Sequence, residues 1–567
     1  MTSCVQTVEW LPERKFREDD QRYLWFHDSL HNNPPITPMG ASVHHWPRGT
    51  QVASEYFQFP YSLGFSYVLQ NGRIYPRPLP ITDPEETQRR EPIFQQKLAD
   101  MLENWPERYE AMVTEWCSLL NYLKGIDKKV LPLDKLLDVL QEAVRVSKRS
   151  WELHFVGMYP VMFTYMNFEN ACKHHGLEER YCRIFLQGFE TKMYEIDKGL
   201  WRLAGLAEEL NLKSLFLEST VEVLEQELGK SNVGQVWLDQ FQSLMATYGR
   251  RTTAAIFDPY YKTWIEDPLP VLSTIQTYIQ KGRFDFEEHT IKIIEEREKL
   301  ISETIKKIPT PEEQEEFTTL LKYAQYTYPF NEDHNFYVEQ WTYSELRYAI
   351  LECGCRLAGF KLLENDEDVF FLTISELENI LNDLILNPKI GIQDHGLRIP
   401  MLIKSRKQVW QELHEVKSDL IIGKIPEERI DDPVFIKTWG LTDEVIRGKA
   451  KPEFEALGRY EGFQGSPGVT EGIARVIFGY EGFSEIQPDE ILIAPFTTPA
   501  WTPLFSKIKG VATDSGGMLA HAAICAREYN IPAVVGTITR GKRVTEGIKT
   551  GDRVRIDGTR GIVEVVG

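Results

Sequence analysis

The spacing of apolar residues divides the chain into stretches of different character. Residues 1 to about 85 show no regular alternation and are rich in aromatic, proline and histidine residues. From there to about residue 420, apolar positions recur at the spacing of amphipathic helices, as in Leu136, Leu137, Val139, Leu140, Ala143 and Val144. The same spacing recurs in the segments 94–123, 179–228, 287–306, 312–325, 342–363 and 402–417. The sequence therefore predicts a large all-α body that follows an irregular N-terminal segment.

Proline and glycine residues mark the expected boundaries of this body. Prolines within 258–270 and 308–311 interrupt the helical pattern and separate it into bundles. From 424 to 464 the chain becomes polar and contains repeated Gly and Pro breaks. We expect a mainly helical domain at 1–423, a linker or hinge at 424–464, and a mobile C-terminal domain at 465–567.

The most informative part of the C-terminal domain surrounds His521. Gly516 and Gly517 precede this histidine, and a run of strong helix-forming residues follows it to Glu528. This pattern places the imidazole at a helix N-terminus, where free backbone N–H groups and the helix dipole favour an anion. An imidazole there is well placed to carry a phosphoryl group, although a lone histidine could also simply cap the helix.

Strands are predicted after this helix. The segment 531–536 is short, apolar and introduced by a proline, and 551–566 has the pattern of two strands around a Gly-containing turn.

These motifs, taken in order, resemble the phosphohistidine swivelling domain of the phosphoenolpyruvate synthase, pyruvate phosphate dikinase and rifampin phosphotransferase group. The matching motifs are Gly465-Ser466-Pro467-Gly468, Gly516-Gly517, His521-Ala522-Ala523, Ala526-Arg527-Glu528, Ile531-Pro532-Ala533-Val534-Val535-Gly536 and Asp557-Gly558. The resemblance implies a β/β/α domain in which His521 carries the phosphoryl group and Gly516, Gly517 and Arg527 bind phosphate.

The sequence departs from this family at one position beside the histidine. Residue 520 is usually a small hydroxyl or thiol residue in the family, and here it is Ala520. A side-chain donor to the phosphoryl group is therefore missing, while backbone N–H groups can still hold the phosphate.

Composition excludes several classes of partner. The net charge of −20 argues against nucleic acid or an anionic membrane as the main partner. The seven cysteines include no metal-like CxxC pair, so we expect free thiols in a reducing compartment and no metal site. We see no secretory signal and no apolar run approaching the ~18 residues of a membrane span. We expect a soluble, cytoplasmic protein.

The source of the phosphoryl group is not apparent in this sequence. Gly229-Lys230-Ser231 lacks the earlier glycine of a GxxxxGK phosphate loop, and nothing resembles the ATP-grasp domain found in the related enzymes. The resemblance therefore implies a separate ATP-grasp nucleotide-binding subunit as partner, with ATP and Mg²⁺ acting through it. Phenylphosphate synthase is a multi-subunit family member that is split in this way.

The helical body also resembles the acceptor-binding domain of rifampin-phosphotransferase-like enzymes, in the segments 25–38, 332–340 and 367–377. Attack by a hydroxyl needs a group that takes its proton, and Asp333 with His334 is the candidate acceptor base pair. The same pair could instead be a helix cap with a surface histidine.

Further acceptor-binding candidates lie in the same body. Arg347, Arg406 and Lys404 could supply a cation to the phosphoryl oxygens. His27 and His31 would share a metal only if their segment were helical, and the prolines at 34–35 favour a packing and hydrogen-bonding role.

Aromatic residues crowd the first 80 positions and recur at 151–165, so they could line an apolar pocket for a flat aromatic alcohol, although most could equally be core. The leading hypothesis is a component of an ATP-dependent dikinase-type phosphotransferase that phosphorylates a small hydroxyl acceptor, a phenol, in aromatic degradation. Two alternatives stay open: phosphorylation of an antibiotic or another alcohol, and a non-catalytic phosphocarrier or regulatory protein.

Overall fold

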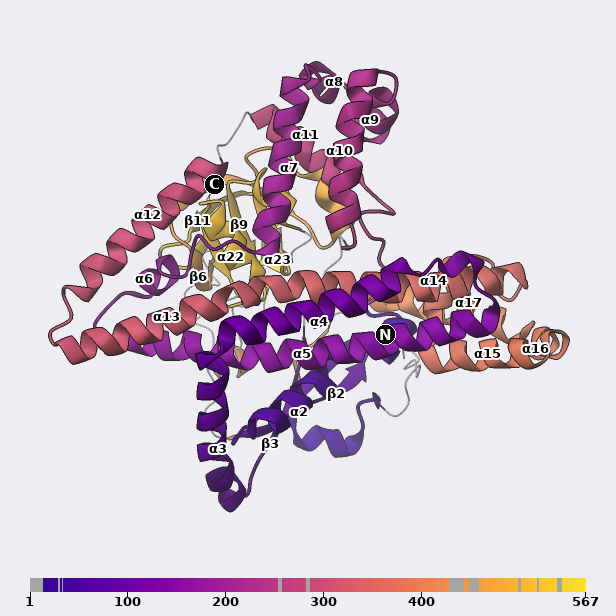
Figure 1. Cartoon of the computed structure of the whole chain (residues 1–567), viewed down its shortest axis with the longest axis horizontal. Helices are drawn as coiled ribbons and strands as arrows, with labels where there is room; N and C mark the ends of the chain where they lie inside the picture. Colours follow the sequence, from indigo (N-terminus) through magenta and orange to yellow (C-terminus); the bar gives the residue numbers. More distant parts are fainter. Residues whose placement is uncertain are drawn as a thin grey trace. The chain divides into compact units, whose positions relative to one another are not determined.

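The computed structural model describes residues 14–28, 31–32, 34–252, 257–281, 286–416, 418–427, 443–447, 458–497, 501–517, 520–537 and 543–566. The chain forms two compact units (Figure 1). Unit 1 comprises Met1–Tyr159, Ile256–Tyr261 and Tyr337–Glu428, and unit 2 comprises Pro160–Ala255, Lys262–Phe336 and Arg429–Gly567. The expected boundaries at 423 and 464 stay a prediction, because much of the linker 424–464 lies outside the described residues. Unit 2 unites helices of the body with the C-terminal domain, which the sequence pattern did not indicate.

Unit 1 is built mainly from helices that begin at recognisable caps. Its helices are α1 (Pro38–Ser42), α2 (Trp46–Phe57), α3 (Pro84–Glu103), α4 (Trp105–Gly125), the first part of α5 (Leu133–His174), α14 (Tyr343–Gly359), α15 (Ile374–Leu386), α16 (Pro388–His395) and α17 (Arg398–His414). Thr373 and Glu376 form a reciprocal capping box at the start of α15, and the Asp83 carboxylate accepts the N–H of Glu85 at the start of α3. These contacts fix where the predicted helices begin.

The N-terminal segment is more regular than its composition predicts. Strands β2 (Ser62–Gln70) and β3 (Arg73–Pro80) form an antiparallel hairpin. Its turn is Asn71-Gly72, and both residues have positive φ, as tight hairpin turns require. Strand β1 (Leu24–Phe26) pairs with β4 (Ile421–Gly423). The expectation of an irregular segment is therefore wrong for 62–80, where the dipeptide Asn71-Gly72 is typical of a hairpin turn.

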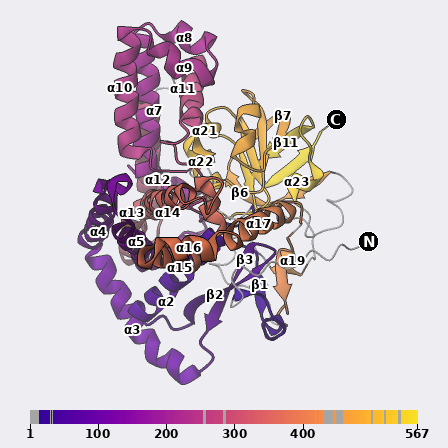
Figure 2. The ribbon, with the colours of Figure 1, turned by 90° about the vertical axis from the view of Figure 1, so that its right-hand side faces the viewer.

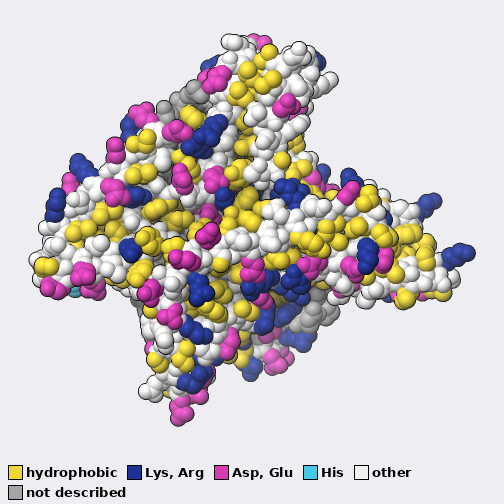
Figure 3. Space-filling model, viewed as in Figure 1, with side chains coloured by type: hydrophobic (Ala, Val, Ile, Leu, Met, Phe, Trp, Pro, Cys, Tyr) yellow, Lys and Arg dark blue, Asp and Glu magenta, His cyan; other side chains and the backbone are white. Residues whose placement is uncertain are grey.

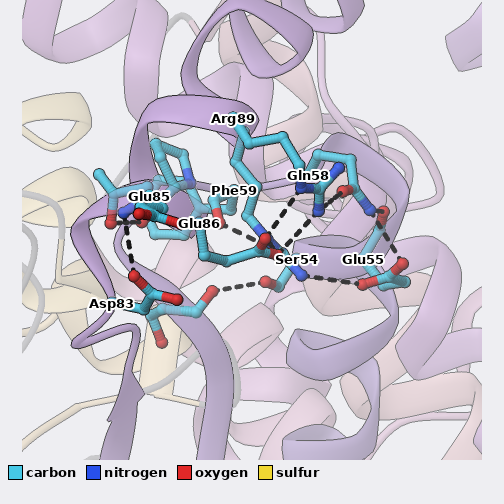
Figure 4. A network of polar contacts seen from close by, with 12 residues as sticks. Ser54, Glu55, Gln58, Phe59, Asp83, Glu85, Glu86 and Arg89 are labelled. Atoms are coloured by element: carbon cyan, nitrogen blue, oxygen red, sulfur yellow. Dashed lines mark hydrogen bonds and ion pairs between the residues drawn. The ribbon is translucent and has the colours of Figure 1, made fainter.

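A network of polar contacts joins α2 to α3 (Figure 4). The Arg89 guanidinium donates to both carboxylate oxygens of Glu86, at 2.8 and 2.7 Å, and to the side-chain oxygen of Gln58 at 3.0 Å. Gln58 ends α2 in the left-handed conformation, so the network holds the point where the chain leaves this helix.

The helical part of unit 2 contains α6 (Glu179–Ile184), α7 (Lys192–Glu209), α8 (Lys213–Glu218), α9 (Val221–Leu228), α10 (Asn232–Tyr248), α11 (Leu269–Lys281), α12 (Phe286–Ile305) and α13 (Pro311–His334). Helix α7 packs against α10 and α11, with α8 and α9 at one end of this group (Figure 2). The buried Trp237 of α10 donates its indole N–H to the carbonyl of Leu203 in α7. Two helices are thereby joined by a polar contact inside an apolar interface.

The C-terminal part of unit 2 contains an eight-stranded sheet of order β5-β12-β11-β7-β8-β9-β10-β6. The strands are β5 (Arg459–Glu461), β6 (Phe463–Ser466), β7 (Val469–Val476), β8 (Ile491–Ala494), β9 (Gly510–Thr513), β10 (Ala533–Val535), β11 (Arg553–Asp557) and β12 (Ile562–Val565). The four strands β7, β8, β9 and β10 are parallel neighbours. The strands predicted at 531–536 and 551–566 are confirmed.

Alternating side chains give this sheet two buried faces. On β8, Ile491 and Ile493 pack with residues of β11 and β12, whereas Leu492 and Ala494 pack with residues of α22 (His521–Glu528). Strands buried on both faces explain why these segments read as continuous apolar runs. The predicted fold class, a large helical body with a C-terminal β/β/α domain, is confirmed.

Charged side chains of both signs lie on the surface of the chain (Figure 3). On the face drawn in Figure 3, basic and acidic side chains are interspersed. Among the described residues, no helix combines the length and apolar character that crossing a bilayer requires.

Candidate active site

His521 lies where a parallel strand turns into a helix. Strand β9 ends at Thr513, and the chain reaches α22 through the loop that contains Gly516 and Gly517. Ala520 is the N-cap, so His521 is the first helical residue, as predicted. Groups that follow the carboxyl ends of parallel strands meet at one edge of the sheet, which is where such folds place their reactive groups.

The loop before His521 is held from both sides. The N–H groups of Asp514 and Ser515 donate to the carbonyls of Ala494 and Pro495, at 3.0 and 2.9 Å. Gly516 has a φ of 114°, and a Cβ on Gly536 would lie 2.5 Å from the Gly516 carbonyl oxygen. Glycine is therefore needed for loop shape and close approach. The phosphate-binding role of Gly516 and Gly517 stays a prediction, and Met518 and Leu519 lie outside the described residues.

The imidazole of His521 is contacted at both ring nitrogens. The Thr497 hydroxyl oxygen lies 3.0 Å from Nδ1, and the Cys525 sulfur lies 3.0 Å from Nε2. Phe505 meets the ring edge-on, with centroids 5.9 Å apart. Thr497 follows β8 and His521 follows β9, so two hydrogen-bonded neighbouring strands place the hydroxyl beside the ring.

Sequence analysis missed both Thr497 and Cys525. Cys525 had a usable signal, because it stands four residues after His521 on the same helix and residues at this spacing are neighbours. Thr497 had none in the local sequence, because its proximity comes from strand pairing.

Burial and charge keep His521 neutral. Burial, followed by the positive charge of Arg251, lowers the pKa of His521 from 6.5 to about 3. A neutral imidazole retains a nitrogen lone pair at neutral pH, which a nucleophile requires.

A set of contacts joins the sheet domain to the helices of the same unit. The Tyr529 hydroxyl donates to an Asp197 carboxylate oxygen on α7 at 3.1 Å and lies 3.1 Å from the Tyr278 hydroxyl on α11. The Lys507 ammonium donates to the Ser273 hydroxyl of α11 at 3.0 Å. Burial raises the pKa of Asp197 to about 7, while Arg251 and Tyr529 act in the opposite direction.

Arg527 lies at the far end of α22 from the loop. Its guanidinium is buried and donates to the carbonyl of Gly465 at 2.9 Å, which attaches the helix to β6. Six residues of helix separate it from His521, or about 9 Å along the axis. This contact favours a structural role, and phosphate binding by Arg527 stays a prediction.

Asp333 and His334 are buried near the end of α13 and engage different partners. The Asp333 carboxylate accepts the N–H of Lys192 at 2.6 Å and so caps the start of α7. The His334 Nδ1 lies 3.1 Å from the carbonyl oxygen of Phe330, so Nδ1 carries the proton because a carbonyl only accepts. The idea of a surface histidine is wrong, since His334 is 8% exposed. The role of the pair as an acceptor base stays a prediction.

The two candidate arginines of unit 1 are committed to internal acceptors. Arg347 donates to the carbonyls of Pro259 and Tyr260 and forms an ion pair with Glu367 at 2.9 Å. Arg406 holds both carboxylate oxygens of Glu376, at 2.6 and 2.9 Å, and the carbonyl of Phe371. These contacts favour a structural role over contact with a phosphoryl group. Lys404 is exposed on α17.

The segment of His27 and His31 is not helical in its described residues, so the spacing needed to share a metal is not formed. His27 donates from Nε2 to the carbonyl of Asn32 at 3.3 Å, and the Ser418 hydroxyl lies 3.2 Å from its Nδ1. His31 instead pairs with Asp28, at 2.9 Å from Nδ1 to the carboxylate. The hydrogen-bonding role expected for both residues agrees with these contacts.

Two segments of the chain match family models of known proteins. Residues 486–561 match the mobile domain of PEP-utilising enzymes. Residues 154–332 match the fourth domain of rifampicin phosphotransferase. Two separate segments of the chain are thus similar to domains of PEP-utilising enzymes and of rifampicin phosphotransferase.

Individual relatives are distant and longer. The chain is 28% identical to chondramide synthase cmdD of Chondromyces crocatus, over 97% of this chain and 14% of that protein. It is 27% identical to the uncharacterized phosphotransferase YvkC of Bacillus subtilis, over 76% of this chain and 49% of the relative. It is 28% identical to a rifampicin phosphotransferase of Bacillus cereus, over 60% of this chain and 36% of the relative. The chain therefore spans at most about half the length of these relatives.

Proposed function

We propose that this chain carries a phosphoryl group on His521 and transfers it to a small hydroxyl acceptor, as a component of an ATP-dependent dikinase-type phosphotransferase. One observation carries the proposal: the imidazole of His521, at the first residue of helix α22, is hydrogen-bonded through Nδ1 to the Thr497 hydroxyl. When the Thr497 oxygen accepts a hydrogen bond from Nδ1–H, the lone pair lies on Nε2, which becomes the attacking nitrogen.

The surroundings suit the phosphorylated state as well as the free base. Attack by Nε2 on phosphorus forms an N–P bond as the P–O bond to the nucleotide donor breaks and its electron pair leaves with the donor oxygen. The bound phosphoryl group adds negative charge at the helix N-terminus, where backbone N–H groups and the helix dipole stabilise it. The thiol of Cys525 is a weak hydrogen-bonding group, so the phosphoryl group can displace it at low cost. Arg251 disfavours a charged imidazolium but favours an anionic phosphoryl group on the same ring.

The phosphoryl group comes, in this proposal, from an ATP-grasp nucleotide-binding subunit that acts as partner. ATP is cleaved to AMP and phosphate overall, and Mg²⁺ neutralises the triphosphate during loading. Support comes from the match of residues 486–561 to the mobile domain of PEP-utilising enzymes. The reaction is assigned to the cytoplasm.

The acceptor is proposed to be a phenol bound by unit 1, so that the product is an aryl phosphate. The aromatic side chains of this unit support a flat acceptor. An antibiotic of the rifampicin kind is the second candidate, because the rifampicin phosphotransferases are relatives over 60% of this chain.

The test combines the chain with a candidate ATP-grasp protein, ATP, Mg²⁺ and phenol, or rifampicin in a parallel reaction. AMP, acid-labile phosphohistidine and the phosphorylated acceptor are followed together. The substitution His521→Ala should abolish phosphohistidine and product, whereas His174→Ala, at an exposed histidine of α5, should change neither. Full product formation by His521→Ala would refute the proposal, and a phosphorylated chain inert to all acceptors would favour a phosphocarrier.

A further inference from the structure

Unit 1 contains a carboxylate–imidazole pair that sequence analysis placed elsewhere. The buried Asp28 carboxylate lies 2.9 Å from Nδ1 of His31, and it also accepts the side-chain N–H of Asn32 at 3.0 Å. A carboxylate only accepts, so Nδ1 of His31 carries the proton and the basic lone pair lies on Nε2. Asp28 is 1% exposed, whereas the side chain of His31 is 28% exposed. The buried Asp28 carboxylate therefore orients the His31 ring, which is itself partly accessible to solvent.

The charges around His31 suit a base. Burial alone lowers the pKa of His31, but the charge and hydrogen bond of Asp28 and the charge of Glu339 outweigh it and raise the pKa above 6.5. Such a ring accepts a proton readily near neutral pH.

His31 lies at one end of a group of packed aromatic rings. His31 stacks on Phe257, with centroids 4.6 Å apart and planes 12° apart. Phe257 also meets Trp151 edge-on at 4.7 Å and faces Tyr343 at 5.9 Å. His44 lies 6.3 Å from Phe257 and 5.9 Å from Trp46. We call His31, His44, Trp46, Trp151, Phe257 and Tyr343 the His44 cluster.

Polar atoms of this region lack protein partners. Neither ring nitrogen of His44 has a hydrogen-bond partner within the described part of the chain, and His44 is 5% exposed. The same holds there for Nε1 of Trp46 and for Oδ1 of Asn32, the residue that braces Asp28. Burial lowers the pKa of His44 to about 3, so the ring is neutral and offers one donor and one acceptor. Each such buried group costs roughly 1–3 kcal/mol while it lacks a partner, and a ligand that supplies the missing hydrogen bond would remove this cost.

We propose that the His44 cluster is the acceptor site, that it takes a planar aromatic ring bearing a hydroxyl group, and that His31 is its base. The inference deepens the proposed function and rests on it. Nε2 of His31 takes the hydroxyl proton while the acceptor oxygen forms a bond to phosphorus. The N–P bond to His521 breaks and its electron pair returns to the imidazole. His44 and Trp46 hydrogen-bond polar atoms of the acceptor and so position its ring.

His44→Phe separates binding from structure. The substitution removes two unpaired buried nitrogens and keeps an aromatic ring, so a purely structural cluster predicts equal or higher thermal stability and unchanged phenol binding. The proposal also predicts equal or higher thermal stability, but it predicts that phenol binds about tenfold more weakly because one hydrogen bond to the ligand is lost. Binding of phenol to the full chain is measured by tryptophan fluorescence, with cyclohexanol as the non-aromatic comparison. Unchanged phenol affinity, or equal affinity for cyclohexanol, would overturn the site.

His31→Gln separates the base from the phosphoryl carrier. It should lower kcat for aryl phosphate about 10²-fold or more while KM for phenol stays within a few-fold. Phosphohistidine on His521 should form at the wild-type rate, and His174→Gln should behave as wild type. Wild-type kcat in His31→Gln would overturn the assignment of the base. If the wild-type chain formed no phosphohistidine, this would instead count against the proposed function. The two failures are therefore distinguishable.

Discussion

The Tyr529 hydroxyl lies 3.1 Å from the Asp197 carboxylate, and this hydrogen bond joins the domain that carries His521 to helix α7 of the same unit. Tyr529 is the C-cap of α22, so this hydrogen bond lies at the opposite end of the helix from His521. The contact holds the histidine domain against α7 and α11 in the position in which Arg251 acts on the imidazole.

Tyr529→Phe removes the donor and keeps the ring, so we expect the domain to separate from α7 more often. A hydrogen bond to a buried carboxylate is worth roughly 1.5–3 kcal/mol, which corresponds to about a tenfold or larger loss of protection. Hydrogen–deuterium exchange of α7 and α22 measures this. Tyr122→Phe, at an exposed tyrosine of unit 1, is the matched control. Equal protection in Tyr529→Phe and the wild type would show that the bond does not hold the domain.

Asp197 should make unit 2 less stable as the pH rises. Burial raises its pKa from 3.8 to about 7. A carboxyl whose folded pKa is raised contributes stability that is complete below pH 3.8 and is lost as the pH rises toward 7. We expect Asp197→Asn to flatten this dependence, by at most about 4 kcal/mol between pH 4 and 8.

Urea unfolding of the wild type and the variant at several pH values makes this comparison. Asp514 has a similarly raised pKa, again mainly through burial, so some dependence should persist in Asp197→Asn. Identical pH profiles for the two chains would contradict the prediction.

Thr497→Val should slow phosphorylation of His521 without unfolding the domain. Valine matches the shape of threonine but offers no oxygen to Nδ1, so the ring loses its fixed tautomer and orientation. We expect the rate of phosphohistidine formation to fall about 10–100-fold, the usual loss when a hydrogen-bond partner that orients a functional histidine is removed. Thr318→Val, on the exposed face of α13, should leave the rate unchanged. A wild-type rate for Thr497→Val would mean that the hydroxyl does not set the tautomer.

Ala520→Ser should stabilise α22. Ala520 is the N-cap and makes no side-chain cap, whereas serine would accept an N–H of the first turn. We expect a gain of roughly 1 kcal/mol in the free energy of unfolding, seen as a higher melting temperature. The same hydroxyl should prolong the lifetime of phosphohistidine by donating to the phosphoryl group. A shorter lifetime would indicate that the new hydroxyl competes with the phosphate for the helix N–H groups.

Local patterns predicted what local chemistry determines. The glycines, helix formers and His521 stand within one short segment, so the sequence alone indicated a histidine at a helix N-terminus. The apolar run of β10 and the turn between β11 and β12 were also predictable from the local sequence. The pairing of Thr497 with His521 depends on two strands being neighbours, and no local pattern records this.

The same reasoning explains the acceptor side. Asp333 and His334 are adjacent in sequence and suggested a pair, yet adjacent helical residues face different directions and each found another partner. Asp28 and His31 form such a pair three positions apart, in a stretch whose described residues are not helical. Arg347 and Arg406 were predicted to supply a cation to the phosphoryl oxygens. Their hydrogen-bond acceptors lie in distant segments of the chain, which sequence spacing does not reveal.

The attachment of Thr497 and His521 to neighbouring strands has a mechanical consequence. Their separation is set by the backbone hydrogen bonds between β8 and β9, which belong to a single sheet. A rigid-body displacement of the whole sheet leaves these bonds intact. In the proposed phosphoryl transfer, the Thr497 hydroxyl would therefore keep its position beside the His521 ring while the sheet moves as a body.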